Sequence, residues 1–117
     1  MNSEQLKQHI VHALEDIKGR DIVELDVRDL TDMTDYMVIA TGTSNRHVQA
    51  LADNARDELR KESVRPIGVE GEGPAEWVLV DFGDVVLHVM LPQTRSFYDL
   101  ERLWSEGRLT APESSSG

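Results

Sequence analysis

The apolar residues of the chain switch between the period of a helix and the period of a strand. Over residues 6–17 and 48–59 they recur every three or four positions, which predicts two amphipathic helices. Over residues 21–27 apolar and acidic residues alternate, as in a strand with one buried face. Residues 36–40 are almost continuously apolar and predict a central strand that is covered on both faces.

The second half of the chain predicts a β-hairpin. Residues 66–69 form a short predicted strand, and the apolar runs 77–82 and 85–91 are joined by Gly83-Asp84. A two-residue link that contains glycine favours a tight turn between antiparallel strands. A short final helix is expected over residues 95–104. This order of elements predicts an α/β fold, a single domain with a mixed β-sheet of about five strands flanked by helices.

The net charge of the chain indicates which class of macromolecule it can bind. Acidic residues outnumber basic ones by 22 to 12, which gives a net charge of −10. Residues 66–91 contain five acids and neither lysine nor arginine. Such a surface repels nucleic-acid phosphates and attracts basic proteins. We therefore expect a basic protein partner and no direct binding of nucleic acid.

Several classes of protein are excluded by what the sequence lacks. Without cysteine there is no disulfide scaffold, no zinc–thiolate site and no thiol nucleophile. The polar N-terminus does not resemble a secretory signal, and no apolar run approaches the roughly 18 residues of a membrane span. We expect a cytoplasmic protein with one domain over residues 1–105. The Ser-rich end, residues 106–117, is expected to be a disordered tail.

The predicted turn at Gly83 and Asp84 fixes which hairpin residues share a face, because side chains alternate across a sheet. One face is entirely aliphatic or aromatic and is expected to face the core. It consists of Val78, Val80, Phe82, Val85, Leu87, Val89 and Leu91. The opposite face is mixed and consists of Trp77, Leu79, Asp81, Val86, His88 and Met90.

The mixed face has two interpretations. A helix or loop could cover it, as is common for sheets in α/β folds. Alternatively it is a partner-binding surface, because a Trp with Leu and Met beside a carboxylate has the composition of a binding hot spot. On the final helix, Tyr98 is expected to be exposed, opposite a cluster on the other side. That cluster consists of Phe97, Leu100, Leu103 and Trp104.

The predicted strand-to-helix junction after residue 41 is a second candidate site. Its residues are Gly42, Thr43, Ser44, Arg46 and His47. Free backbone amides at such a junction could hold an anion such as a phosphate. The favoured interpretation is that Ser44 or Asn45 caps the helix while Gly42 makes the turn, since phosphate loops normally have more glycines and a lysine.

No arrangement of residues predicts catalysis or a metal site. The Gly-x-Ser-x-Gly pattern is absent around Ser44, and the four histidines have no ligand spacing with carboxylates. Asp53 and Asp57 lie within a helix, whereas Asp81 and Asp84 flank a turn. Neither pair places two carboxylates on one strand face to hold Mg²⁺. We therefore expect a protein that is not an enzyme and has no cofactor.

Short motifs stand in a specific order along the chain and carry a resemblance to a known family. They are Asp26-Val27-Arg28, Thr34-Asp35-Tyr36, residues 41–48, Gly68-Val69-Glu70-Gly71, Glu76-Trp77, residues 81–84 with His88, and residues 97–104. Together they resemble the ribosomal silencing factor family, also called Iojap-related, over roughly residues 3–105. The resemblance implies a homodimeric α/β protein related in fold to nucleotidyltransferases but lacking their active site.

The resemblance also implies a partner and a mechanism. Members of the family bind the fourteenth protein of the large ribosomal subunit where the two subunits meet. Binding there blocks subunit joining and represses translation when nutrients are scarce, as in stationary phase. The residues expected to contact this basic protein are Trp77, Leu79, Asp81, His88, Met90 and Tyr98. Two alternatives stay open: a small-molecule or nucleotide-binding protein that uses residues 42–47, and an adaptor for another basic protein.

Overall fold

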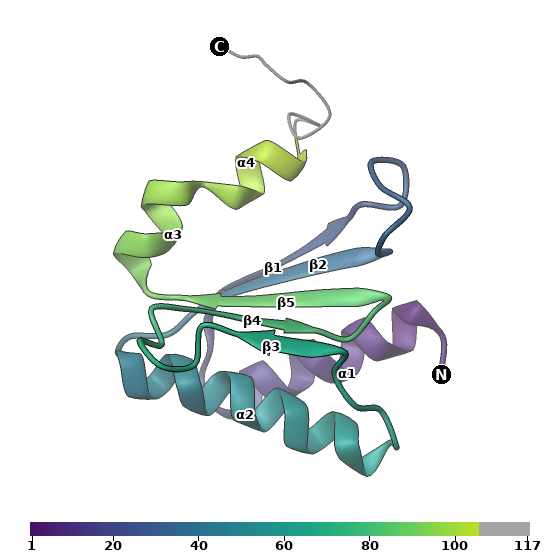
Figure 1. The fold of residues 1–117 in the computed structure, drawn as a ribbon, viewed down its shortest axis with the longest axis horizontal. Coiled ribbons are helices and arrows are strands. Elements are labelled where there is room, and N and C mark those ends of the chain that lie inside the picture. Colours follow the sequence, from purple (N-terminus) through teal and green to yellow (C-terminus); the bar gives the residue numbers. More distant parts are fainter. Residues whose placement is uncertain (106–117) are drawn as a thin grey trace.

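The computed structural model describes residues 1–105, which form three layers (Figure 1). Helices α1 (Ser3–Asp16) and α2 (Asn45–Lys61) lie side by side under one face of a five-stranded sheet. The short helices α3 (Pro92–Tyr98) and α4 (Leu100–Ser105) lie over part of the other face. The strands are β1 (Arg20–Asp26), β2 (Tyr36–Thr41), β3 (Gly68–Glu70), β4 (Trp77–Asp81) and β5 (Val85–Met90).

The sheet is mixed, as predicted. Its strand order is β1-β2-β5-β4-β3, so β5 is the middle strand. Strands β2 and β5 are parallel, and every other neighbouring pair is antiparallel. All residues of β2 are buried, which confirms the prediction from its unbroken apolar run.

The face of the sheet under α1 and α2 holds the main hydrophobic core. Both helices bury an apolar stripe at the predicted positions, and α1 begins with a capping box in which Asn2 Oδ1 accepts from the Gln5 amide at 2.8 Å. The hairpin residues predicted to face the core all lie in this cluster, namely Val78, Val80, Phe82, Val85, Leu87, Val89 and Leu91. Packing of these helices on the sheet is therefore what excludes water from this face.

The hairpin has the predicted register. Trp77 pairs with Met90, Leu79 with His88 and Asp81 with Val86. The Phe82 amide donates to the Val85 carbonyl at 2.9 Å, and Gly83 has φ 90°, a left-handed conformation that glycine adopts without strain. Asp81 Oδ1 also accepts a hydrogen bond from the Gly83 amide at 2.8 Å, which stabilises the turn.

The predicted final helix is wrong in one respect, because the structure divides it in two. Asp99 has φ 50° and separates α3 from α4, so residues on either side do not share one helical face. Phe97 is predicted to cluster with Leu100 on the side opposite Tyr98, but it is 80% exposed, whereas Leu100 packs against the sheet. The side chain of Trp104 and the predicted tail, residues 106–117, lie outside the described residues. Within residues 1–105, no helix has the length and apolar character needed to cross a membrane.

Candidate functional site

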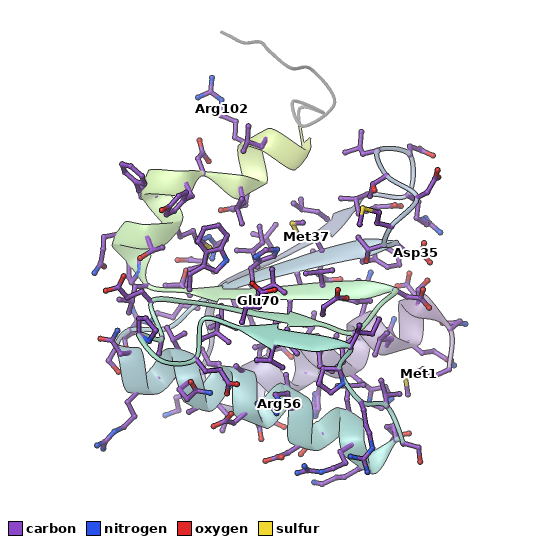
Figure 2. The ribbon with its side chains drawn as sticks, viewed as in Figure 1. Met1, Asp35, Met37, Arg56, Glu70 and Arg102 are labelled. Atoms are coloured by element: carbon purple, nitrogen blue, oxygen red, sulfur yellow. The ribbon has the colours of Figure 1, made fainter. Side chains whose placement is uncertain are left out.

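The second face of the sheet is covered only in part. A small apolar cluster of Val27, Met37, Ile39 and Met90 lies there, and Leu100 of α4 packs against it. Figure 2 shows Met37 on the side of the sheet that faces α3 and α4. The interpretation that a helix covers the mixed face is therefore correct for this part of it.

The rest of this face carries exposed aromatic side chains. Tyr98 is 49% exposed, as predicted, and its ring centroid lies 4.7 Å from that of Trp77. Phe97 makes an edge contact with Tyr98, with 5.0 Å between the ring centroids. Leu79, on the same strand and face as Trp77, is half-buried. We call Trp77, Leu79, Phe97 and Tyr98 the aromatic patch.

A buried histidine holds the indole of Trp77. Trp77 Nε1 donates a hydrogen bond to His88 Nδ1 at 2.9 Å. Because an indole nitrogen only donates, His88 Nδ1 must be unprotonated. His88 is 6% exposed, and its burial lowers its pKa to about 4, so the imidazole is neutral near pH 7. The neutral ring thus fixes the orientation of Trp77 from beneath.

Two residues expected to contact a partner do not reach the surface. Met90 is completely buried in the small cluster that also contacts Trp77 and Leu100, so it does not lie on the exposed surface that it was expected to share with Trp77. His88 is also buried, and its ring accepts a hydrogen bond from Trp77. Asp81 is half-buried, and its Oδ1 is engaged by the Gly83 amide.

Phe97 is the exposed residue that the helical period missed. A single helix would place it on the side of Leu100, three positions later. The break at Asp99 changes this, and aspartate is one of the few residues that adopts a left-handed conformation without a large cost. Asp99, directly after Phe97 and Tyr98, was therefore the feature of the sequence that could have indicated a break in the helix.

Acidic side chains border the aromatic patch. Glu70 lies opposite Leu79 in the β3–β4 pair, so the two share the patch face (Figure 2). Asp81 lies two residues beyond Leu79 on the same face. The surface therefore combines aromatic contact area with negative charge, which suits a basic partner.

The junction at residues 42–47 is occupied by the protein's own groups. Ser44 Oγ accepts from the His47 amide at 3.1 Å, which confirms the predicted cap. The Thr43 amide donates to His47 Nδ1 at 2.9 Å, and the Gly42 amide donates to the Met90 carbonyl at 3.0 Å. His47 Nε2 lies 2.8 Å from the Ile17 carbonyl and therefore carries the ring proton. These backbone amides are hydrogen-bonded within the protein, so helix capping and the turn account for residues 42–47. Arg46 is exposed in the first turn of α2.

A polar cavity of about 490 Å³ lies beside this junction. Its lining includes Arg20 and Arg95, but also the carboxylates of Asp21, Asp99 and Glu101. Such mixed charge disfavours a phosphate group. Among the residues described, no three His, Asp or Glu side chains are placed to hold a metal ion.

The fold and this surface define a small α/β domain whose partly covered sheet face carries aromatic and acidic side chains. The family model described as ribosomal silencing factor during starvation matches residues 1–116. The chain belongs to the ribosomal silencing factor family, which confirms the family predicted from the sequence motifs.

Relatives support this assignment in sequence and in structure. A ribosomal silencing factor of Chromobacterium violaceum is 50% identical over 104 residues, covering 89% of this chain and 85% of the relative. A mouse protein named mitochondrial assembly of ribosomal large subunit protein 1 is 38% identical over 99 residues, covering 82% of this chain and 43% of that protein. A crystal structure of a Chromobacterium violaceum protein has a TM-score of 0.89 at 46% identity, covering 100% of this chain and 95% of that one.

Proposed function

We propose that this protein silences ribosomes by binding the fourteenth protein of the large subunit through the aromatic patch. Membership of the family supports a role in ribosome silencing. The mouse relative is named for assembly of the large subunit, which supports that subunit as the place of binding. In this proposal the bound factor blocks joining of the small subunit by its bulk, without any chemical reaction.

The observation that carries the proposal is a chain of contacting aromatic rings, half-buried at Trp77 and exposed at Tyr98 and Phe97, on an acidic sheet face. Trp77 is fixed by His88, Tyr98 packs on Trp77, and Phe97 packs on Tyr98. Large aromatic side chains at the centre of an interface provide most of its binding energy. A ribosomal protein that binds RNA phosphates is rich in Lys and Arg, so Glu70 and Asp81 would steer it toward the patch.

Two further features belong to the proposal. We expect the protein to act as a homodimer and to repress translation when nutrients are scarce. We also expect Leu79 and Asp81 to contact the ribosomal protein beside Trp77 and Tyr98, while His88 and Met90 support the surface from below.

Sedimentation with separated ribosomal subunits tests the proposal. The protein should co-migrate with the large subunit, and prior binding should reduce the fraction of joined ribosomes when small subunits are added. Trp77→Ala and Tyr98→Ala should each weaken binding by at least about 2 kcal/mol, or about 30-fold in Kd. Met33→Ala is a matched control, because Met33 is an exposed apolar residue (88%) in a loop outside the patch.

The ionic strength of the sedimentation buffer determines how a negative result is interpreted. Attraction between an acidic and a basic surface is strongest at low ionic strength. Absence of co-migration at low salt would therefore refute ribosome binding. Normal binding by both patch variants would instead refute the aromatic patch as the contact surface.

A further inference from the structure

Arg95 joins three elements on the patch side of the sheet. Its side chain is only 11% exposed. Nε and Nη2 donate to the two carboxylate oxygens of Glu101 at 2.8 and 2.9 Å, and Nη1 donates to Thr41 Oγ1 at 2.8 Å. Arg95 lies on α3, Glu101 on α4 and Thr41 at the end of β2, so one guanidinium links all three elements.

The Arg95–Glu101 pair bridges the break between α3 and α4, and so it constrains the angle between these two helices. Arg95 and Glu101 lie on opposite sides of the left-handed residue Asp99, where the backbone changes direction. The Asp99 amide donates to the Arg95 carbonyl at 2.9 Å, which closes α3. A two-pronged arginine–carboxylate pair has a defined planar geometry, so it fixes orientation as well as distance. The hydrogen bond from Arg95 also lowers the pKa of Glu101, which keeps the carboxylate ionised.

The exposed rings depend on this arrangement. Phe97 and Tyr98 are the last residues of α3 and lie two and three positions after Arg95, within one helical turn. Neither residue belongs to the main core cluster under α1 and α2, and both are exposed. Their position over Trp77 therefore depends on what anchors residues 92–105, which we call the α3–α4 arm.

We infer that Arg95 is a positioning residue for the partner-binding surface: by holding Glu101 and Thr41 together, it keeps Tyr98 packed on Trp77 and Phe97 projecting outward. The partner side of this inference depends on the proposed function. A loosened arm would have to be ordered again during binding, and that cost would reduce affinity without changing any contact residue. When only a fraction of molecules has the arm in place, the apparent Kd rises by the inverse of that fraction.

Arg95→Lys is the direct test, because lysine keeps the charge but lacks the planar fork. Arg28→Lys is the matched control, because Arg28 makes the same two-pronged pair with Asp26, at 2.9 and 2.6 Å, away from the patch. Both are made in a Trp104→Phe background, so that Trp77 is the remaining tryptophan. Near-UV circular dichroism and Trp77 fluorescence then report the contact between Trp77 and Tyr98.

The expected result separates positioning from folding. Arg95→Lys should change the Trp77 signals and raise the Kd for the large subunit at least tenfold, with the cooperative unfolding of the main core retained in urea. Arg28→Lys should leave the Trp77 signals and the Kd at the values of its background. If Arg95→Lys loses cooperative unfolding, Thr41→Ser and Thr41→Val decide: serine keeps the hydroxyl and should preserve affinity, and valine should not.

The remaining outcomes would refute either the role of Arg95 or the proposed function, and the measurements tell these two cases apart. A changed Trp77 signal with unchanged affinity would overturn the inference, and so would an unchanged signal and affinity in Arg95→Lys. If the parent protein does not bind the large subunit, the proposed function fails. The Trp77 spectra would still decide whether Arg95 positions the aromatic rings.

Discussion

The two faces of the sheet differ in how they are covered and in what they contain. Under α1 and α2 the sheet presents an unbroken set of aliphatic and aromatic side chains, and these are almost entirely buried. The opposite face mixes apolar residues with Thr41, Asp81 and His88, and the α3–α4 arm lies over part of it. Its polar groups are engaged by specific partners, such as His88 by Trp77 and Thr41 by Arg95.

This difference separates the face that stabilises the fold from the face proposed to bind a partner. The helix-covered face gains free energy from area removed from water, which is not directional. The opposite face gains less from burial and uses directional bonds to fix the orientation of exposed rings. Substitutions on the two faces are therefore expected to have different consequences for stability and for binding.

The largest effect is expected from a cavity in the helix-covered face. Leu87 of β5 is completely buried, so Leu87→Ala should lower the free energy of unfolding by about 2–5 kcal/mol. Leu79 on the neighbouring strand β4 is only half-buried on the other face, so Leu79→Ala should cost less than half as much. Urea denaturation of the two variants measures both values. Equal losses would contradict the division of roles between the faces.

The next effect concerns pH and the buried imidazole. The pKa of His88 falls from the ordinary value of 6.5 to about 4 because the ring is buried. Between these values the unfolded chain binds a proton at this residue and the folded protein does not, so stability falls as the pH is lowered. Since one pKa unit corresponds to about 1.4 kcal/mol, the loss from pH 7 to pH 4 approaches 3 kcal/mol.

His88→Asn isolates this contribution. The asparagine Oδ1 can accept the Trp77 hydrogen bond in place of Nδ1 but does not titrate. The variant should therefore lose about 3 kcal/mol less than the parent between pH 7 and pH 4, as measured by urea denaturation at several pH values. Glu101, whose pKa is lowered by Arg95, also loses stabilisation on acidification, but it is present in both proteins and cancels. Identical pH profiles would show that the folded protein protonates His88 normally.

The residues of the sheet face that packs against α1 and α2 could be predicted from the sequence, because the spacing of apolar residues within each helix and strand is a local pattern. Helical and strand periods identified the buried stripe of α2, the fully buried strand β2 and the core side of the hairpin. The Gly83-Asp84 turn fixed the register, and the register fixed which residues share a face. Such information lies within a few residues along the chain, where periodicity is strongest.

The opposite face depends on contacts between distant residues, which periodicity does not contain. Arg95 and Thr41 are 54 positions apart, yet their hydrogen bond anchors the α3–α4 arm. The break at Asp99 exposes Phe97, and Met90 is buried in a small cluster against which Trp77 and Leu100 pack. Composition identified a mixed face with a Trp and a carboxylate, but it left open whether this face is covered and did not indicate which of its residues reach solvent.

The smallest effect on stability is expected where the effect on binding is large. Phe97 is 80% exposed, so Phe97→Ala should change the free energy of unfolding by no more than about 0.5 kcal/mol. If the aromatic patch binds the ribosome, the same substitution should still raise the Kd, because an exposed ring on a preorganised surface is buried only in the complex. Urea denaturation and co-sedimentation with the large subunit measure the two quantities on one sample. A stable variant with weakened binding would locate binding on the face that contributes least to folding, and a stable variant with normal binding would restrict the contact surface to Trp77, Leu79 and Tyr98.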